Sequence, residues 1–564
     1  MKTLIRLTLL ALFIYPAAAR TTPAQSSQSA SAKAPLFQIT VPSKSHSAPI
    51  TGRVYLILSR KESKDLLDQI GDFTDETPFF AADISALPAG QPANITAATL
   101  GYPLRSLKQI PAGDYYAQAI VNIYTEFHRS DGHTIWAHMD QWEGQQFNHS
   151  PGNLYSDVKK IHFDPASAAA RPISLEADHV IPPVEIPTDT QWVKHIKIES
   201  KLLTKFWGHP IYIGAVVLLP QGYDEHPSVS YPVVYEQGHF GLQAPLYMLL
   251  EPPTPQEEKR GGVERYAAFQ AWSGPNFPRM IGVTFQHPTP YFDDSYAVNS
   301  ANDGPYGDAL MQELIPYLEE HFRMIREPWA RLLTGGSTGG WESLALQLYH
   351  PDFFGGTFTG FPDPIDFRHY QLVNAYKDDN AFNVPGYDWV QRDRPMMRTA
   401  EGQVIETMQQ MSLLEEVLGT HGRSGQQFEA WEAVYGPVGS DGYTQPLWDK
   451  LTGKVDHHVA DYMRDHGYDL RDYAEKHWST IGPQLTNKIN IWVGDMDNFY
   501  LNLAVYDMEE FFNSHPEAHA HFQYGRPEKG HGWLPWPLPD FLRTLGQHLS
   551  DSAPSGTDTA SWHY

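Results

Sequence analysis

A single serine between two pairs of glycines, in LLTGGSTGGWESLALQLYH (332–350), is the first feature of the chain that could do chemistry. Four glycines would destabilise a helix. The apolar run before Ser337 is instead typical of a strand, and the run after it is typical of a helix. In such a strand–turn–helix, small residues two positions before and after the serine let the backbone turn tightly and expose the Oγ as a nucleophile. Gly335 and Gly339 meet this requirement, so Ser337 is predicted to be a nucleophile; a solvated hydroxyl in an ordinary turn is the alternative.

A nucleophilic serine needs a histidine base and a carboxylate that orients it, in the chain order Ser, Asp, His for this type of turn. INIWVGDMDNFYL places two aspartates after a predicted strand, and RPEKGHGW places His531 after the next one. Open α/β sheets collect their sites at the carboxyl ends of strands. Asp497 is preferred to Asp495, because it lies further from the strand and reaches the imidazole more easily, while Asp495 could cap the following helix. The predicted catalytic residues are Ser337, Asp497 and His531.

The negative charge that develops on the substrate oxygen would need two preorganised N–H donors. The backbone amide of Thr338, directly after the nucleophile, is expected to be one of them. The second is expected from the loop in YEQGHFG (235–241), which follows an early strand and offers the amides of His239 and Phe240. Glycines on both sides would let this backbone approach a substrate. An ordinary glycine turn is the alternative for this loop.

Short apolar strands that alternate with amphipathic helices must position these residues, and this pattern begins after Gln191. It is typical of a parallel sheet covered on both faces. Strands are expected at 194–200, 213–220, 231–237, 280–286, 331–336, 355–360, 489–494 and 519–525. The spacing of apolar residues predicts helices over 308–322 and 498–512. Residues 361–488 are too long for a link between strands, so we expect an inserted cap over the carboxyl edge of the sheet, or an interaction surface.

The N-terminus has the pattern of a signal peptide. Residues 1–19 contain Lys2 and Arg6, then an apolar run that ends in three alanines. An uncleaved anchor is the alternative, but about 13 apolar residues are few for a membrane span. We therefore expect an exported protein, periplasmic or secreted, without stable membrane insertion after cleavage.

The rest of the chain divides by composition. Residues 20–36 are polar and of low complexity and are expected to be a linker. Strand-like runs bounded by Gly, Pro, Asn and Asp fill 37–165 and predict a β-rich, sandwich-like domain. A proline-rich connector, 166–190, leads to the α/β domain at 191–550. Residues 551–564 are expected to be a flexible tail.

Composition excludes several classes of function. Hydrophobic residues make up 41% of the chain, which is enough for sizeable cores. The net charge is −25 and no basic stripe is present, which argues against a nucleic-acid partner. The absence of cysteine excludes thiol catalysis and cysteine metal sites. His457 and Asp461 have metal-ligand spacing on a predicted helix, but a solvated face explains them better, so we expect neither a metal nor another cofactor.

These motifs resemble the putative-esterase family of α/β-hydrolases, which includes S-formylglutathione hydrolases, feruloyl esterases, enterochelin esterase and mycolyltransferases. The resemblance covers about 191–545 and is carried by YPVVYEQGHFG, NSANDGPYGDALMQELIPYLEEHF, RLLTGGSTGGWESLALQLYHPDFFGG, GDMDNFYL and KGHGW. It implies an α/β-hydrolase fold, a mostly parallel sheet covered by helices, with the three predicted catalytic residues as its triad. It also implies a secondary role for Asn302 or Tyr306 in the floor of the site. The chain departs from the family at Gln237, where histidine is usual, and in the length of its insertion.

We therefore expect a serine hydrolase that cleaves a carboxylic ester through an acyl-enzyme, on a small-molecule or polysaccharide-linked substrate. A peptidase or acyltransferase on the same triad is one alternative. A catalytically inert protein that binds carbohydrate or protein is another, with cap tryptophans at Trp389, Trp431, Trp448 and Trp478 as its binding surface. The oligomeric state stays open.

Overall fold

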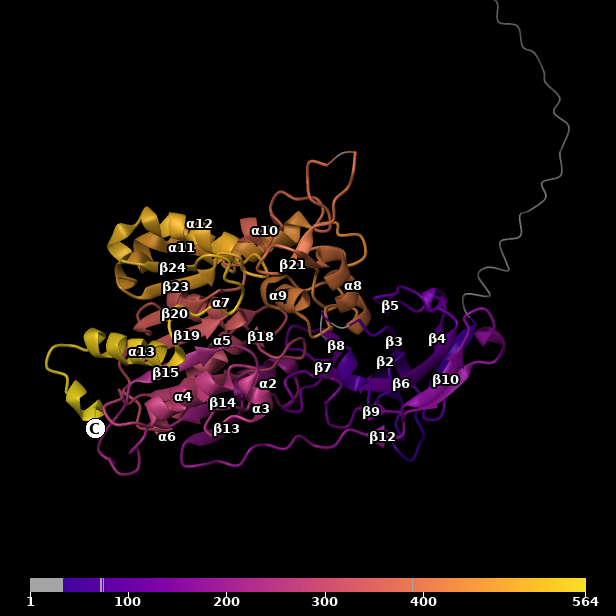
Figure 1. The fold of residues 1–564 in the computed structure, drawn as a ribbon, viewed down its shortest axis with the longest axis horizontal. Coiled ribbons are helices and arrows are strands. Elements are labelled where there is room, and N and C mark those ends of the chain that lie inside the picture. Colours follow the sequence, from indigo (N-terminus) through magenta and orange to yellow (C-terminus); the bar gives the residue numbers. More distant parts are fainter. Residues whose placement is uncertain (1–33, 72–73, 75, 388, 564) are drawn as a thin grey trace, which may run out of the picture.

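The computed structural model describes residues 34–71, 74, 76–387 and 389–563. The expected signal peptide, 1–19, and all but the last three residues of the expected linker, 20–36, lie outside the described residues. An N-terminal domain rich in β-sheet lies beside a larger α/β domain, and helices of the cap lie above the junction between them (Figure 1). Within the described ranges, no helix is long and apolar enough to cross a membrane.

The α/β domain is built on an eight-stranded sheet in the order β13-β14-β16-β15-β19-β20-β23-β24. The strands are β13 (Val193–Glu199), β14 (Tyr212–Leu218), β15 (Val233–Gln237), β16 (Ile281–Gln286), β19 (Arg331–Gly336), β20 (Gly356–Gly360), β23 (Ile489–Gly494) and β24 (His521–Gly525). From β16 to β24 all neighbouring strands are parallel, and β14 pairs antiparallel with both β13 and β16. The predicted α/β-hydrolase fold with a mostly parallel sheet is confirmed.

Helices cover both faces of this sheet because neighbouring residues of each strand point to opposite sides. Leu332 packs in a core with α4 and α13, whereas Leu333 packs in another core with Leu346 of α7. The helices of the domain are α2 (Lys201–Trp207), α3 (Pro255–Glu258), α4 (Gly262–Trp272), α5 (Tyr306–Ala309), α6 (Ile315–His321), α7 (Thr338–Tyr349), α12 (Asn502–Asn513) and α13 (Leu538–Ser552). Both faces of the central strands are buried, which explains why their sequences are continuous apolar runs.

The helix predicted over 308–322 is interrupted in the structure. A wider π-helical turn, Leu310–Leu314, separates α5 from α6. Pro316 lies directly after this turn and has no N–H to donate to the preceding turn of helix. The apolar spacing alone could not reveal this change of winding.

The N-terminal domain consists mainly of two sheets around one core. Its strands are β1 (Pro35–Thr40), β2 (Ile50–Ser59), β3 (Phe79–Leu87), β4 (Pro92–Thr96), β5 (Gly101–Tyr102), β6 (Gly113–Ile123), β7 (Thr125–His128), β8 (Thr134–Ala137), β9 (Leu154–Tyr155), β10 (Lys159–Phe163), β11 (Ile173–Glu176) and β12 (His179–Val180). One sheet has the order β11-β1-β4, and the other is built around β6-β2-β3. Phe37 and Ile95 of the first sheet share a core with Leu56 and Val121 of the second. This is a sandwich-like arrangement.

The cap is held between the two domains. It contains β21 (Pro395–Arg398), β22 (Val404–Thr407), α8 (Met408–Leu418), α9 (Gln427–Tyr435), α10 (His457–Asp465) and α11 (Leu470–Ile481). Arg53 of β2 donates to the carbonyl of Val417 over 3.0 Å, and the Tyr55 hydroxyl donates to that of Leu418 over 2.5 Å. The last carbonyls of a helix have no partner within the helix. The N-terminal domain therefore supplies donors at the C-terminal end of α8.

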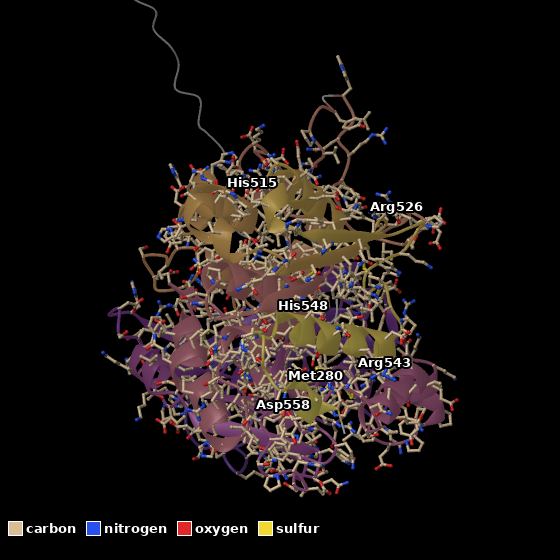
Figure 2. The ribbon with its side chains drawn as sticks, turned by 90° about the vertical axis from the view of Figure 1, so that its left-hand side faces the viewer. Met280, His515, Arg526, Arg543, His548 and Asp558 are labelled. Carbon is tan, nitrogen blue, oxygen red and sulfur yellow. The ribbon has the colours of Figure 1, made fainter. Side chains whose placement is uncertain are left out.

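The C-terminal segment differs from the expected flexible tail, 551–564. Helix α13 continues to Ser552, and the side chain of Trp562 is 3% exposed and stacks on Trp329 with ring centroids 5.7 Å apart. The amide of Arg279 also donates to the Trp562 carbonyl over 2.8 Å. Figure 2 shows this segment, at Asp558, below α13. Burial of one large aromatic side chain explains why a polar-looking tail packs.

Candidate active site

Ser337 lies at the sharp turn between β19 and α7. Its backbone has φ 58° and ψ −121°, a strained conformation for a residue with a side chain. Two hydrogen bonds hold it: its amide donates to the Gly360 carbonyl, and its carbonyl accepts from the Asp363 amide, both over 3.1 Å. A Cβ on Gly335 would lie 2.3 Å from the Gly339 carbonyl oxygen, so the turn requires a glycine there. The predicted strand–turn–helix geometry is therefore present.

Asp497 and His531 meet beyond the ends of β23 and β24. The Nδ1 atom of His531 lies 2.8 Å from Oδ2 of Asp497, whose side chain is fully buried. The other oxygen of Asp497, Oδ1, accepts from the amides of Phe499 over 2.9 Å and Leu501 over 3.3 Å. A buried carboxylate holds the proton on Nδ1 and leaves Nε2 free to accept one. Asp495, the alternative, makes no such contact with the imidazole.

Two aromatic rings fix the plane of the His531 imidazole. The ring of Phe361 lies edge-on at a centroid distance of 4.7 Å, and that of Phe499 lies edge-on at 4.9 Å. The amide of His531 donates to the Asn498 side chain over 2.7 Å. Because both the ring and the backbone are held, His531 presents Nε2 in one direction only.

The Ser337 hydroxyl donates to Oδ1 of Asp363 over 3.4 Å, and among the described residues it makes no hydrogen bond with His531. Asp363 is 3% exposed and follows β20, the strand next to β19. Its Oδ2 accepts from the hydroxyl of Tyr296 over 2.7 Å and from the indole N–H of Trp431 over 3.2 Å. Burial raises the pKa of Asp363 above its ordinary value. The sequence reasoning missed this residue, although its place after a central strand was a usable signal.

The loop after β15 lies beside the turn at Ser337, because Gln237 pairs with Gly335 in the register of β15 and β19. Within this loop the Gly241 amide donates to the Gln286 side chain over 2.8 Å, which leaves the amides of His239 and Phe240 as candidates. Thr338 is the first residue of α7, so its amide has no acceptor within the helix. These are the positions that the sequence predicts for the oxyanion donors.

A residue of the N-terminal domain supports this loop. The ring of Phe240 packs edge-on against that of Trp142, at a centroid distance of 5.2 Å and an angle of 87°. Lys197 in turn lies over the Trp142 ring, 4.2 Å from its centroid. The N-terminal domain therefore contributes directly to the position of the loop that is expected to bind the oxyanion.

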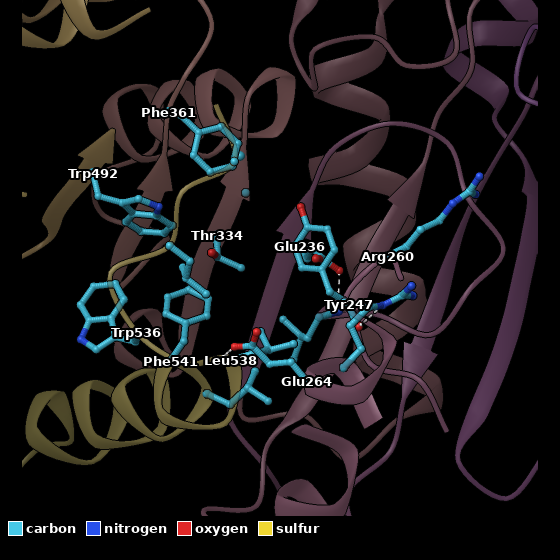
Figure 3. A pocket seen from close by; sticks show the side chains of 18 residues that line it. Glu236, Tyr247, Arg260, Glu264, Thr334, Phe361, Trp492, Trp536, Leu538 and Phe541 are labelled. Atoms are coloured by element: carbon cyan, nitrogen blue, oxygen red, sulfur yellow. Dashed lines mark hydrogen bonds between the residues drawn. The ribbon is translucent and has the colours of Figure 1, made fainter. Parts of the chain in front are cut away.

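A cavity of about 490 Å³ opens next to the site. Gly336 and Gly532, the neighbours of Ser337 and His531 in the chain, line one part of it, together with the ring of Phe361 (Figure 3). Residues of α4 and α13, of strands β15, β19 and β23, and of the loops beside them line the rest. Phe361, the first residue of the cap insertion 361–488, is the one described cap residue that contributes. The cavity therefore lies on the α4–α13 side of the sheet and not beneath the cap.

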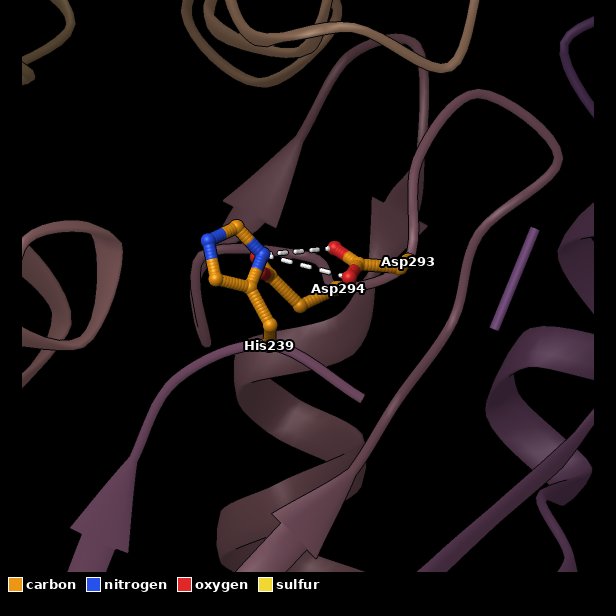
Figure 4. A group of neighbouring side chains, drawn as sticks. All are labelled: His239, Asp293 and Asp294. Atoms are coloured by element: carbon orange, nitrogen blue, oxygen red, sulfur yellow. Dashed lines mark hydrogen bonds and ion pairs between the residues drawn. The ribbon is translucent and has the colours of Figure 1, made fainter. Parts of the chain in front are cut away.

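The side chain of His239 carries a positive charge beside the oxyanion loop. Its Nδ1 lies 3.0 Å from Asp293 Oδ1 and 3.7 Å from Asp294 Oδ2 (Figure 4). Burial alone would lower the pKa of His239, but the charges of Asp293 and Asp294 outweigh it and raise the pKa to about 10. The imidazole is therefore protonated at neutral pH.

Behind this pair lie two buried carboxyl groups that oppose each other. Asp294 is 1% exposed and Glu342 of α7 is fully buried. Within the described chain, Asp294 Oδ2 and the carboxyl oxygens of Glu342 have no hydrogen-bond partner other than each other. Burial and the charge of Asp293 raise the pKa of Asp294 to about 7, and burial and the charge of Asp294 raise that of Glu342 well above its usual range. The two groups cannot both ionise cheaply.

Carboxylates and histidines this close could in principle hold a metal ion. Asp294 and Glu342 lie with His287, and Asp294 also lies with His239 and Asp293, each group within 4.8 Å. However, Nδ1 of His287 accepts from the Ser295 amide over 3.0 Å, so in the neutral ring Nε2 carries the proton. Nδ1 of His239 donates to Asp293. The nitrogens that face the carboxylates are thus protonated, and the donor set fits a shared proton better than a metal.

Replacing Glu342 with glutamine should stabilise the protein more at pH 8 than at pH 5. Burial and the charge of Asp294 raise the pKa of Glu342 in the folded protein, so the contribution of Glu342 to stability is lost as pH rises above its ordinary pKa. The variant removes this carboxyl, and its gain in stability should therefore be larger at pH 8 than at pH 5. Apparent Tm measured across pH 5–8 tests this. Glu320→Gln, an exposed control on α6, should show no such slope, and equal shifts at both pH values would contradict the prediction.

Other residues singled out from the sequence lie elsewhere. The side-chain amide of Asn302 donates to the carbonyls of Ala433 and Gly436, and the Tyr306 hydroxyl donates to the carbonyl of Pro288. Both therefore hold the cap or a loop and do not reach Ser337.

The helix with metal-ligand spacing forms no metal cluster among the described residues. His457 faces Asp379, with Nε2 3.5 Å from Oδ1, and Asp461 pairs with Arg464 over 2.9 Å. This agrees with a solvated face of α10.

The four cap tryptophans do not form one platform. Trp431 and Trp448 are buried, and Trp478 is partly buried. Only Trp389 is freely accessible, at 98% exposure. Buried indoles cannot stack on a sugar, so these residues serve mainly as cap core.

Comparisons with known proteins match a family model to part of the α/β domain. The model of the family described as "Putative esterase" matches residues 283–507, a range that includes Ser337, Asp363 and Asp497. No curated protein matches the chain. Solved structures with a similar course of the chain include an S-formylglutathione hydrolase from Agrobacterium tumefaciens, with 13% identity, 65% of this chain and 99% of that chain covered, and a TM-score of 0.33.

Two further solved structures are a ferulic acid esterase from Anaeromyces mucronatus and the fluorophosphonate-binding serine hydrolase F of Staphylococcus aureus. The first is 15% identical, with 65% of this chain and 97% of that one covered and a TM-score of 0.29. The second is 12% identical, with 64% and 97% covered and a TM-score of 0.31. These similarities are too distant to indicate a substrate. The family model covers residues 283–507 of the α/β domain, and the topology of the sheet is that of an α/β-hydrolase fold.

Proposed function

We propose that this protein is an exported serine hydrolase that cleaves a carboxylic ester through an acyl-enzyme on Ser337. The observation that carries the proposal is the 2.8 Å hydrogen bond between buried Asp497 and His531, at the same edge of the sheet as the strained turn at Ser337. Serine, acid and base follow one another along the chain in the order typical of this fold. The match to an esterase family model supports a carboxylic ester as the bond that the protein cleaves.

In the first half of the reaction, the Ser337 hydroxyl turns from Asp363 to Nε2 of His531. Nε2 takes the proton as Oγ attacks the ester carbonyl carbon and forms a tetrahedral intermediate. The amides of Thr338 and of His239 or Phe240 bind the oxyanion. The carbon–oxygen bond to the alcohol then breaks, and His531 gives its proton to the leaving alkoxide.

In the second half, water attacks the acyl-enzyme. His531 accepts a proton from the water, and a second tetrahedral intermediate forms in the same oxyanion site. Its collapse breaks the bond to Ser337, which recovers the proton from His531, and the carboxylic acid leaves. No cofactor is required, and the atoms balance as ester plus water giving acid plus alcohol.

Asp497 and His239 stabilise the charges that develop during the reaction. Buried Asp497 stabilises the imidazolium that forms on His531 and keeps the proton on Nδ1. The positive charge of His239, held by Asp293, lies on the loop that is expected to bind the oxyanion. A fixed charge of this sign favours the transition state, in which negative charge develops on the carbonyl oxygen.

Export rests on residues 1–19, whose basic, apolar and small-residue segments have the order of a signal peptide. The substrate is then an ester outside the cytoplasm. N-terminal sequencing of the protein recovered from a secreting host would test cleavage after residue 19.

Labelling with a fluorophosphonate probe tests the nucleophile. Native protein should gain one phosphonyl group, and peptide mass spectrometry should place it on Ser337. Ser343→Ala is a matched control, because Ser343 is a buried serine of α7 that donates to the Gly340 carbonyl. This variant should label normally. A label on another serine, or native protein that hydrolyses p-nitrophenyl acetate without labelling, would refute the proposal. Hydrolysis of p-nitroanilides in the same assay separates an esterase from a peptidase.

A further inference from the structure

The cavity beside Gly336 has one wall of apolar side chains. Its aromatic rings include Phe361, Trp492, Trp536 and Phe541, and Leu534, Leu538 and Leu542 lie in the same lining. The ring of Trp536 stacks on that of Phe541 with centroids 5.6 Å apart and meets Trp492 edge-on at 5.7 Å. These rings come from β23, α13 and the loop before α13, and Figure 3 shows them on one side of the cavity. They form a rigid surface for an apolar group.

The cavity adjoins the catalytic residues at Phe361. A Cβ on Gly336 would lie 2.4 Å from the tip of the Phe361 ring, so this ring rests directly on the backbone next to Ser337. The same ring meets the imidazole of His531 at 4.7 Å. A group bound in the cavity is therefore separated from the nucleophile only by this ring and by the backbone of the turn.

The two carboxyl groups that line the cavity both accept hydrogen bonds. Glu236 Oε2 accepts from the Leu246 amide over 2.6 Å and from the Thr284 hydroxyl over 2.8 Å. Glu264 Oε1 accepts from the Leu538 amide over 2.7 Å. Two arginines, Arg260 and Arg265, also line the cavity. Arg265 Nε donates to the Tyr247 carbonyl over 2.8 Å, and Figure 3 shows the Arg260 side chain directed away from the aromatic rings.

We propose that this cavity binds one uncharged, bulky apolar group of the ester, aromatic or branched, on the α4–α13 side of the sheet. The inference rests on the proposed function and adds its substrate class. A volume of about 490 Å³ is in the range of ligand sites and far exceeds an acetyl group. A charged group is disfavoured beside the aromatic and leucine side chains, because apolar surface does not replace the hydration of a charge. The α/β domain itself then selects the apolar group of the ester. The helices of the cap instead cover Asp363, through Trp431.

Filling the cavity tests the proposal. Leu534→Trp should lower kcat/KM for p-nitrophenyl 4-phenylbutyrate and octanoate by about tenfold or more, while p-nitrophenyl acetate changes by less than about twofold. Acetates of bulky alcohols, such as 1-naphthyl acetate, form a second series that assigns the group to the acyl or the alcohol side. Loss confined to bulky members of either series supports the proposal. Val263→Trp, at a 60% exposed position of α4, is the matched control and should change neither series.

Two measurements keep the result decisive. Trp536→Leu enlarges the cavity and should shift preference toward still larger groups, so the proposal can be tested even if Leu534→Trp does not fold.

Wild-type enzyme should cleave the hemisuccinate ester worse than the neutral butyrate ester. Equal changes for small and bulky esters in both variants, or a preference for the charged ester, would overturn the cavity assignment. Activity that survives in Ser337→Ala would instead overturn the proposed function.

Discussion

Replacing Ser337 with alanine should lower kcat for p-nitrophenyl acetate by about 10⁵-fold, because no other group can form the acyl-enzyme. The fold should survive the change. Ser337 already holds a positive φ that alanine can occupy at similar cost, and the lost hydrogen bond to Asp363 is long, at 3.4 Å. An apparent Tm within a few degrees of wild type is expected.

The measurement is steady-state hydrolysis with the pre-steady-state burst recorded beside it. Wild type should release a burst of p-nitrophenol equal to the concentration of active sites if deacylation is slow, and the variant should release none. Ser343→Ala, the buried serine one and a half turns along α7, controls for the loss of a hydroxyl in this helix. A variant that keeps more than about one percent of wild-type kcat would show that Ser337 is not the nucleophile.

The central sheet could be predicted from the sequence because its strands are buried on both faces. The segments 331–336 and 489–494 match β19 and β23 residue for residue. Each is a short apolar run that ends in glycine, and nothing in either run competes with strand formation. Ser337, Asp497 and His531 could then be chosen as candidates, because this fold carries its catalytic residues in the chain order Ser, Asp, His.

Contacts that cross the fold could not be predicted in this way. Asp363 lies in FPDP, which reads as a turn, and its importance depends on Trp431, 68 residues later, folding back over it. Glu342 has the helical spacing of a solvent-facing residue on α7, but elements around it bury the helix on every side. Periodicity reports which face of a helix is apolar. It does not report whether another element covers the polar face.

The same limit applies to the contact between domains. Arg53 binds the end of α8 across 364 positions of sequence, and Trp142 supports a loop about a hundred residues away. Both side chains read as ordinary members of a β-rich domain. Arg53 and Trp142 have these partners only because folding brings α8 and the loop after β15 against the N-terminal domain. Neither segment shows this contact in its own sequence.

Replacing Asp497 with asparagine should lower kcat by about 10⁴-fold without moving the backbone. The reason lies in the two amides of Phe499 and Leu501, which donate to Oδ1. An asparagine in this position must present its carbonyl oxygen to those donors, so its NH₂ group faces Nδ1 of His531. Nδ1 then has to accept a hydrogen bond, the ring proton moves to Nε2, and Nε2 can no longer take the proton of Ser337.

Asp495→Asn is the matched control for this prediction, since it removes the neighbouring carboxylate and leaves the hydrogen bond to His531 intact. Its kcat should stay within about threefold of wild type. The tautomer of His531 can be read directly from the ¹⁵N chemical shifts of its ring, which should exchange their assignments between wild type and Asp497→Asn. If Asp495→Asn loses activity and Asp497→Asn does not, the orienting acid is Asp495. The 2.8 Å contact with Asp497 then serves only to hold the loop that carries His531.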